Sequence, residues 1–261
     1  MTQDTGKFRN TTDKFYTKPL VAKKCIDQII ETIPDASQYV WVEPSAGNGS
    51  FFNHITFSKI GIDIEPGSTN IQKQDYLTWE PIDKDIIIFG NPPFGRQSSI
   101  AKAFITKSCK FAKVIAFILP RSFTKPSMYN SFDLKFHLVY SIELEKDSFL
   151  LNDKTYDVPC IFQIWEKRDM QREVEKKIEP KGFKYVKSDY DIALRRVGVY
   201  AGKCYNAEKK YSVQSHYFIK FDKYDVNIIE KINNHVFPSN TVGPRSLSKQ
   251  EINKVLNLIL A

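Results

Sequence analysis

Cysteine, histidine and long apolar runs are scarce in this sequence, and each scarcity excludes a class of protein. The four cysteines, Cys25, Cys109, Cys160 and Cys204, are far apart and form no Cys-x-x-Cys pair. This spacing argues against a zinc site and against a disulfide scaffold, and it suits a reducing compartment. The four histidines share no metal-ligand spacing, so we expect no metal cofactor.

The longest apolar runs have only the length of β-strands, as in Asp85-Ile-Ile-Ile-Phe89. None approaches the roughly 20 residues that a membrane-spanning helix needs. Met1 to Asn10 are polar and lack the apolar region of a signal peptide. We therefore expect no membrane attachment, and a location in the cytoplasm, nucleoid or nucleus rather than secretion.

Positive charge is concentrated towards the C-terminus. The chain of 261 residues has a net charge of +8, with 17 Lys+Arg against 11 Asp+Glu in residues 169–261 and 21 against 19 in residues 1–168. A basic surplus in one part of a chain favours a polyanionic partner such as nucleic acid. A solvated, lysine-rich surface would produce the same count.

Apolar, strand-length runs alternate with helical patterns through the first 120 residues. This alternation predicts a parallel sheet that helices cover on both faces. Leu138–Ile142 and Pro159–Trp165 predict two further strands, which a long connection joins as an antiparallel edge of the same sheet. The runs are 39–42, 59–64, 85–89 and 113–119, and the helical patterns start at Pro19 and at Ile100.

The charged stretch 166–177 has no apolar stripe and is the expected linker. We predict a flexible N-terminus at 1–14, a catalytic domain at 15–168 and a small basic α+β extension at 169–261. Within the extension, 192–200 and 216–221 are strand-like. Ser248-Lys-Gln-Glu251 has the pattern of a capping box and predicts a C-terminal helix.

A glycine-containing turn, Glu43-Pro-Ser-Ala-Gly-Asn-Gly49, follows the first predicted strand. Two glycines between a strand and a helix let the backbone approach a ligand closely. The third glycine of the dinucleotide-binding fingerprint is missing, which weakens an NAD or FAD interpretation. The absence of a following Gly-Lys-Ser/Thr excludes a P-loop nucleotide-binding site.

Acidic residues follow the next strand-length segments. Asp63 lies where an acidic side chain can accept hydrogen bonds from both ribose hydroxyls of an adenosine group. Asp75 can bind an adenine amine, and Tyr76 can stack on the adenine ring. The structural alternatives are a turn carboxylate at Asp63, and a loop acid beside an aromatic core residue at Asp75 and Tyr76.

Gly90-Asn-Pro-Pro-Phe-Gly95 is the most specific motif in the chain. Two consecutive prolines fix the backbone and remove amide donors, so the loop is stiff and its carbonyls can accept hydrogen bonds. The side-chain carbonyl of Asn91 and the carbonyl of Pro92 can hold the two hydrogens of a planar amine. Phe94 can then stack on the base that carries this amine.

These motifs, with Phe15-Tyr-Thr-Lys-Pro19, resemble the class I S-adenosylmethionine-dependent adenine-N6 methyltransferases. Their order is similar to that in gamma-type DNA adenine methyltransferases, over residues 13–168. The resemblance implies a Rossmann-like, mostly parallel seven-stranded sheet with helices on both faces. It implies S-adenosyl-L-methionine as cofactor and the N6 amine of adenine in nucleic acid as target, with DNA favoured.

The resemblance also implies a role for individual residues. Those that contact the methionine end of the cofactor, its ribose or its adenine are Tyr16, Thr17, Pro19, Glu43, Pro44, Ala46, Gly47, Asp63, Asp75 and Tyr76. The catalytic residues are Asn91, Pro92, Pro93 and Phe94. In the C-terminal extension, Arg195, Arg196, Lys203 and Arg245 are candidate contacts to the nucleic acid, or else solvated charges of exposed strands.

Four alternative functions fit the same motif. Asn-Pro-Pro-aromatic segments also serve enzymes that methylate the side-chain amide of glutamine in proteins, and enzymes that methylate guanine amines in ribosomal RNA. RNA adenine, in ribosomal RNA or beside the messenger RNA cap, is an alternative substrate. A catalytically inactive partner that only binds nucleic acid is the non-enzymatic alternative, although such a protein has no chemical reason to retain both Asn91 and the glycine turn.

Overall fold

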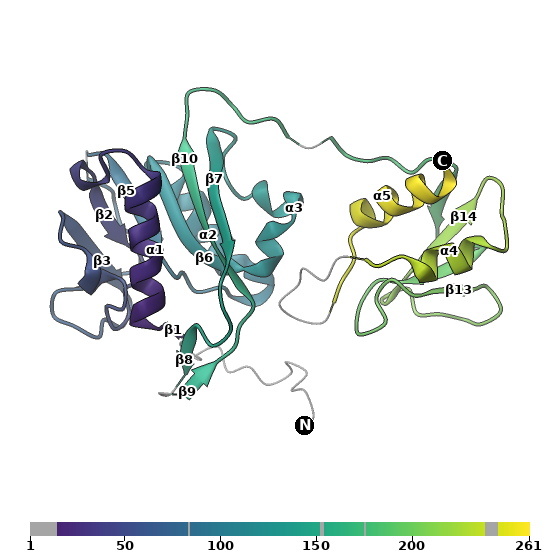
Figure 1. Ribbon diagram of the computed structural model, residues 1–261, viewed down its shortest axis with the longest axis horizontal. Helices are drawn as coiled ribbons and strands as arrows, with labels where there is room; N and C mark the ends of the chain where they lie inside the picture. Colours follow the sequence, from purple (N-terminus) through teal and green to yellow (C-terminus); the bar gives the residue numbers. More distant parts are fainter. Residues whose placement is uncertain (1–14, 83, 152–153, 175, 238–244) are drawn as a thin grey trace. The chain divides into compact units, whose positions relative to one another are not determined.

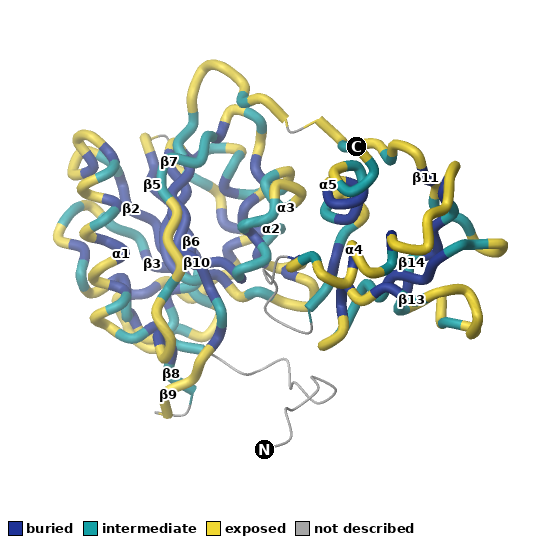
Figure 2. The backbone as a smooth tube through the Cα atoms, turned by 45° about the vertical axis from the view of Figure 1, so that its right-hand side comes forward, coloured by how far each residue is buried: buried dark blue, intermediate teal, exposed yellow. Residues whose placement is uncertain are grey.

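The computed structural model describes residues 15–261 except 83, 152–153, 175 and 238–244. Residues 1–14, for which we predict flexibility, lie outside the described residues. The chain forms two compact units, residues 1–174 and 175–261, and the division falls within the charged stretch 166–177. Each unit has its own buried core (Figure 2), so each is described by itself.

A seven-stranded sheet forms the centre of the first unit (Figure 1). Its strand order is β4-β3-β2-β5-β6-β10-β7, and β10 is antiparallel to both of its neighbours while the other adjacent pairs are parallel. This arrangement confirms the predicted α/β class and the antiparallel pair at one edge. The strands are β2 (Val40–Glu43), β3 (Lys59–Asp63), β4 (Gln72–Lys73), β5 (Ile86–Gly90), β6 (Val114–Pro120), β7 (Phe136–Glu143) and β10 (Cys160–Lys167).

Both faces of this sheet are covered. Every residue of β5 and β6 is buried, and successive strand residues point to opposite faces, so both faces must be packed. On one face, alternate residues of β2 and β5 pack with α2 (Ser99–Ser108). On the other face, the Trp41 and Phe89 rings meet with centroids 5.3 Å apart. Helix α1 (Pro19–Thr32) crosses in front of the sheet in Figure 1, and proline at its first position needs no amide donor there.

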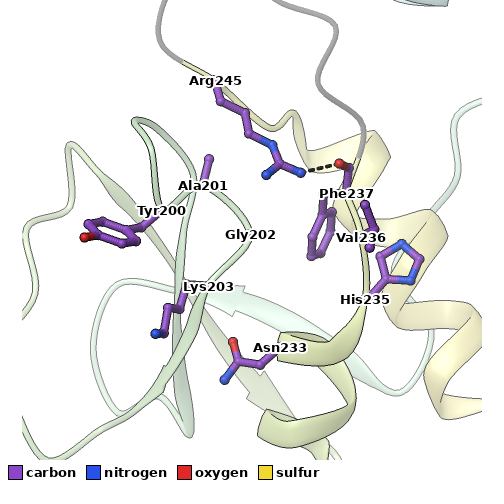
Figure 3. A pocket seen from close by; sticks show the side chains of 9 residues that line it. All are labelled: Tyr200, Ala201, Gly202, Lys203, Asn233, His235, Val236, Phe237 and Arg245. Atoms are coloured by element: carbon purple, nitrogen blue, oxygen red, sulfur yellow. Dashed lines mark hydrogen bonds between the residues drawn. The ribbon is translucent and has the colours of Figure 1, made fainter. Parts of the chain in front are cut away.

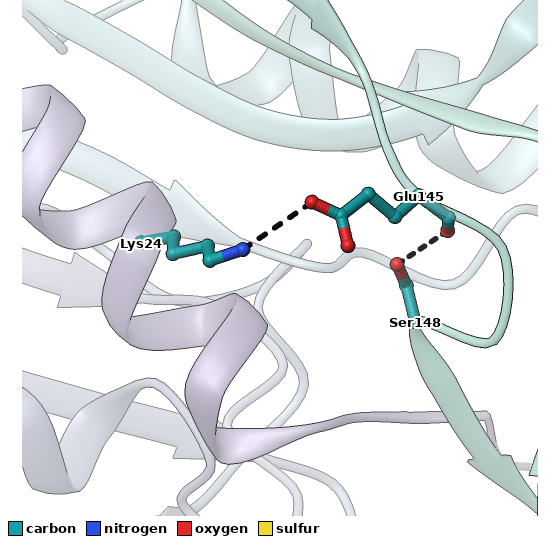
Figure 4. A network of polar contacts seen from close by, with 3 residues as sticks. All are labelled: Lys24, Glu145 and Ser148. Atoms are coloured by element: carbon teal, nitrogen blue, oxygen red, sulfur yellow. Dashed lines mark hydrogen bonds and ion pairs between the residues drawn. The ribbon is translucent and has the colours of Figure 1, made fainter.

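A small three-stranded sheet holds the segment that precedes α1. Strand β1 (Tyr16–Thr17) pairs antiparallel with β8 (Phe149–Leu151), which pairs with β9 (Lys154–Tyr156). Lys24 of α1 lies 3.3 Å from the carboxylate of Glu145, and the Ser148 hydroxyl donates to the Glu145 carbonyl (Figure 4). The ion pair is exposed and contributes little stability, so the β1–β8 pairing positions this segment.

The first unit also contains short helical turns. After the glycine-containing turn, Phe52–His54 form a single 3-10 turn (η2), and β3 already begins at Lys59. The other turns are η1 (Ala36–Gln38), η3 (Arg96–Ser98) and η4 (Arg121–Thr124), with a short helix α3 (Pro126–Tyr129).

The second unit is a four-stranded antiparallel sheet with two helices. The strand order is β11-β14-β12-β13, and the core joins the sheet to both helices through Leu194, Ile219, Ile232 and Leu256. The elements are β11 (Phe183–Val186), β12 (Ile192–Arg195), β13 (Cys204–Asn206), β14 (His216–Phe221), α4 (Ile228–Asn234) and α5 (Lys249–Leu260). This composition agrees with the small α+β extension that we predicted.

The structure confirms one prediction in this unit, the capping box, and differs from another, the strand over 192–200. The capping box is confirmed: the Glu251 amide donates to the Ser248 hydroxyl, and the Ser248 amide donates to the Glu251 carboxylate at 2.8 Å. The strand expected over 192–200 ends at Arg195 instead, because Gly198 has a φ of +90° and its carbonyl accepts from the Ala201 amide in a turn. Within the described part of the chain, no helix is long and apolar enough to cross a membrane.

Candidate active site

The topology brings the predicted motifs to one edge of the large sheet. The strand order reverses between β2 and β5, since β3 and β4 lie on one side of β2 and the later strands lie on the other. Ligands of such sheets bind outside the carboxyl ends of the strands at this switch point. Glu43 ends β2, Asp63 ends the neighbouring β3, and Asn91 follows directly after β5.

The turn after β2 leaves its backbone open to a ligand. Gly47 and Gly49 have φ values of +51° and +83°, which favour glycine. The Gly47 amide donates to the Asp63 carboxylate at 2.7 Å, so the turn is bonded to the end of the next strand. A Cβ on Gly47 would lie 3.0 Å from the Tyr16 ring, which places that ring against the turn. Tyr16, Gly47 and Asp63 therefore form one cluster.

Asp63 is half-buried and held by two backbone amides. One carboxylate oxygen accepts from Gly47, and the other accepts from the Glu65 amide at 2.8 Å. Each carboxylate oxygen has a further lone pair. Asp63 can therefore accept two hydroxyl hydrogen bonds without losing the contacts that position it.

Asn91 is held by the segment that β1 contributes. Its side-chain nitrogen donates to the Phe15 carbonyl at 3.4 Å and to the Thr17 hydroxyl at 3.3 Å, while its backbone carbonyl accepts from the Ser45 hydroxyl at 3.1 Å. These contacts orient the amide and leave Oδ1 buried with no hydrogen-bond partner among the described residues. A buried carbonyl without a donor costs about 1–3 kcal/mol, so an unpaired oxygen at this position needs an explanation.

The residues after Asn91 form a stiff loop. Pro92 is buried and Pro93 is exposed, and neither has a backbone donor. Phe94 is half-buried against the core of the unit, and its carbonyl accepts from the Ile100 amide at 3.1 Å. A Cβ on Gly95 would lie 2.5 Å from the Ile100 side chain, so glycine allows the loop to pack on the start of α2.

Glu43 is an acidic residue inside the protein. It is 2% exposed, and its Oε2 has no hydrogen-bond partner among the described residues. Burial, with a smaller contribution from Asp63, raises the pKa of the Glu43 carboxyl well above its ordinary value, against the opposing effects of a backbone hydrogen bond from Phe52 and of the Lys59 charge. A Cβ on Gly90 would lie 3.1 Å from the Glu43 side chain, so the two strand ends are in close contact.

The other predicted cofactor residues lie at different depths. Thr17, Pro44 and Ala46 are buried, and the Ala46 amide donates to the Ile62 carbonyl at 3.0 Å, which ties the turn to β3. Pro19 is exposed at the first position of α1. Asp75 is exposed, and its carboxylate accepts from the Leu77 amide at 2.9 Å, as in a turn.

Tyr76 is not brought to the site. Its side chain is 1% exposed, its hydroxyl lies 2.7 Å from the Ser108 hydroxyl, and its ring packs 5.0 Å from that of Phe104. The structure therefore corrects the expectation that Tyr76 stacks on a cofactor adenine. The ring belongs to the core beneath α2, because an aromatic side chain gains more from packing there than from a loop surface.

The four basic residues predicted in the second unit make different side-chain contacts. Arg195 and Arg196 donate to the backbone carbonyls of Val197 and Gln214, at 2.9 and 3.1 Å. Lys203 and Arg245 instead line a hollow of about 420 Å³, where Arg245 donates to the Phe237 carbonyl (Figure 3). The residues that line this hollow all belong to the second unit.

Three contributors to the site have no individual role in the sequence patterns. Ser45 holds the backbone of Asn91, the carbonyl of Phe15 holds its side chain, and Gly90 allows Glu43 to pack. A glycine between a buried strand and two prolines was the available signal for Gly90. The contacts of Ser45 and Phe15 join segments 46 and 76 residues apart, which no local pattern reveals. The described residues contain no group of three or more His, Cys, Asp or Glu that would hold a metal ion.

No protein-family model and no curated protein matches the chain. Among solved structures, a protein of Pyrococcus horikoshii assigned as an RNA methyltransferase is similar, with 15% identity, a TM-score of 0.48, and coverage of 63% of this chain and 92% of the other. A type I restriction-modification methyltransferase subunit of Streptococcus thermophilus has 18% identity and a TM-score of 0.42, with coverage of 59% and 45%.

A third similar structure is a modification subunit assigned to a type I restriction enzyme of Vibrio vulnificus. It has 12% identity and a TM-score of 0.46, with coverage of 95% of this chain and 62% of the other. All three TM-scores lie below 0.5, so the functional proposals below depend on the geometry of this chain's own residues.

Proposed function

We propose that the protein is an S-adenosylmethionine-dependent methyltransferase that acts on the exocyclic N6 amine of adenine in nucleic acid, with DNA favoured. The observation that carries this proposal is the side-chain oxygen of Asn91, which is oriented and buried and has no hydrogen-bond partner among the described residues. An acceptor in that state, at the switch point of a parallel sheet and just before two prolines, suits the hydrogens of a planar amine.

The residues at the sheet edge fit the proposed cofactor. Asp63 can accept the two ribose hydroxyls, and the glycine turn lets a bulky group approach the backbone beside Tyr16. Among the described residues, Glu43 Oε2 is buried without a hydrogen-bond partner, so it can accept a hydrogen bond from the amino group at the methionine end. When bound, S-adenosylmethionine supplies an electrophilic methyl group on a positively charged sulfur.

Asn91 and Pro92 bind the amine of the substrate. The Asn91 side-chain oxygen and the Pro92 carbonyl accept the two hydrogens of the amine, which directs the nitrogen lone pair out of the base plane. The nitrogen gains positive charge as it gains the methyl group, and both oxygens stabilise that charge. The methylated nitrogen then releases a proton to solvent, so no side chain needs to act as a base.

The nucleic-acid part of the proposal depends on charge and on the motif context. Residues 175–261 carry 16 Lys+Arg against 9 Asp+Glu, a surplus of seven positive charges. Such a surplus favours binding of a polyanion. The motif Asn91 to Phe94 by itself fits any planar amine, so a glutamine amide and a guanine amine remain alternatives that the substrate experiment distinguishes.

The test is transfer of a labelled methyl group to duplex DNA, single-stranded DNA, ribosomal RNA, capped RNA and a glutamine-containing protein in parallel. Mass spectrometry then identifies the modified nucleoside or residue. We expect N6-methyladenosine or its deoxy form. A methylated glutamine or guanine would overturn the adenine assignment, and no transfer to any of the substrates would overturn the enzyme assignment.

Asn91→Ala should reduce methyl transfer by about 100-fold or more, because it removes an acceptor that acts on developing charge. Affinity for S-adenosylmethionine, measured by calorimetry, should remain within a few-fold of the wild type. The matched control is Asn70→Ala, which changes an exposed asparagine in a loop of the same unit. Equal activity of Asn91→Ala and the control variant would exclude the proposed mechanism.

A further inference from the structure

The hollow of the second unit combines positive charge with a lack of acidic groups. Lys203 and Arg245 line it, and none of the nine described residues that line it is acidic. Figure 3 shows Lys203 and Arg245 on different sides of the space beside Gly202. Its volume of about 420 Å³ lies within the roughly 300–1,000 Å³ range of pockets for small ligands. The site therefore has the charge and the size to take one anionic group with an attached ring.

Apolar side chains at the hollow are unusually exposed. Tyr200 is 64% exposed and Val236 is 87% exposed, and Val199, next to Tyr200, is 85% exposed. A Cβ on Gly202 would lie 2.6 Å from the Phe237 ring, so glycine lets this ring pack closely at the hollow. Grouped apolar side chains on a surface, rimmed by polar residues, mark an interaction site.

We propose that this hollow binds one unpaired nucleotide of single-stranded nucleic acid. The base packs on the exposed Tyr200 ring, and the adjoining phosphates lie near Lys203 and Arg245. Base stacking on an aromatic ring beside cationic side chains is the general mode by which proteins hold single strands. The inference rests on the proposed function, since it takes nucleic acid as the substrate, and it specifies that the strand is unpaired where this unit binds it.

A duplex suits the hollow less well. Paired bases are stacked inside the helix, so a duplex presents phosphates and groove edges rather than free base faces. Lysine and arginine alone would suffice for phosphate contacts, and the exposed Tyr200 ring would then have no apolar partner. A flexible single strand supplies both the base face and the phosphate.

Binding of fluorescently labelled 20-nucleotide strands to the full-length protein, followed by anisotropy, tests the inference. Single-stranded DNA and RNA of mixed sequence and the corresponding DNA duplex are compared without cofactor, so binding is measured apart from methyl transfer. We expect both single strands, or one of them, to bind more tightly than the duplex. Tyr200→Ala should weaken single-strand binding on the order of 10-fold, and Tyr200→Phe should retain it.

Lys203→Ala should reduce the slope of log affinity against log salt by about 0.7, the contribution of one phosphate contact. The matched controls are Lys184→Ala, an exposed lysine on β11 at the other edge of the same sheet, and Tyr224→Ala, a tyrosine that is 42% exposed. Both control variants should bind as the wild type does.

Two results would overturn the inference: equal or tighter binding of the duplex, or single-strand binding that Tyr200→Ala and Lys203→Ala leave unchanged. These failures are distinct from a failure of the proposed function. If the protein methylates adenine while these variants bind normally, the proposed function is supported and the proposed role of the hollow is contradicted. If the variants weaken single-strand binding but the protein transfers no methyl group, the role of the hollow is supported and the proposed function is contradicted.

Discussion

The buried carboxyl group of Glu43 has an energetic consequence for the free protein. Its pKa is raised by burial, so the folded state holds its proton at pH values where the unfolded chain has already released it. The unfolded chain ionises near the ordinary glutamate pKa of about 4.3. Between that value and the raised pKa, the folded protein binds more protons, and its stability falls as pH rises.

Glu43→Gln should therefore stabilise the protein increasingly as pH rises above about 4.3. Within the window between the two pKa values, the difference in unfolding free energy from wild type should grow by up to about 1.4 kcal/mol per pH unit. Urea unfolding from pH 4 to 8 measures it, with Glu208→Gln as the control at an exposed position. A difference that does not change with pH would show that Glu43 is ionised in the folded state.

Asp63 contributes to cofactor affinity in the proposed site. Asp63→Ala should weaken S-adenosylmethionine binding about 10- to 100-fold, because hydrogen bonds to a charged group contribute about 1.5–3 kcal/mol. Calorimetry measures this affinity. Asp85→Ala is the control, since Asp85 lies just before β5 at the opposite ends of the strands, where it pairs with Lys113 at 3.6 Å. Unchanged affinity in Asp63→Ala would remove Asp63 from the cofactor site.

At the scale of elements, the capping box at the start of α5 is a sequence motif whose hydrogen bonds lie within the motif itself. Ser248 and Glu251 exchange hydrogen bonds within one helical turn. Ser248→Ala should destabilise the second unit by about 1 kcal/mol, the usual effect of losing a helix cap. Urea unfolding followed by far-UV circular dichroism checks it, with Ser188→Ala at an exposed loop position as the control. Identical unfolding of both variants would contradict a stabilising role for the cap.

Strands and loops differ in how well local patterns predicted them. The buried runs that became β2, β5 and β6 were predictable because a strand packed on both faces needs an apolar residue at every position. The strand expected through Tyr200 failed because Gly198 and Gly202 adopt positive φ values and turn the chain. Tyr76 shows the same limit in the site, since one aromatic residue beside an acid fits a core or a pocket equally well.

At the scale of the whole molecule, the chain has two units with separate cores. We propose that the first unit binds the cofactor and the second binds nucleic acid. A chain truncated to residues 1–174 should retain S-adenosylmethionine affinity within a few-fold, because all proposed cofactor contacts lie in that unit. It should lose most of its affinity for nucleic acid and most of the salt dependence of binding, because the surplus of positive charge lies in residues 175–261. Anisotropy titrations from 50 to 200 mM salt test this, with the full chain as reference. Undiminished nucleic-acid binding would contradict a binding role for the second unit.

The sequence by itself determined the class of fold and the chemistry to look for. The periodicity of buried residues is a local property of the sequence. An asparagine followed by two prolines is a stiff segment with free hydrogen-bond acceptors in any fold, because both properties follow from the residues themselves. The tertiary structure alone decided which groups meet. Phe15 and Thr17 orient Asn91, and Gly90 packs against Glu43. Tyr76 packs in the core, and Lys203 and Arg245 line one hollow. These contacts join segments far apart in the chain, and only the packing of strands and turns sets their distances.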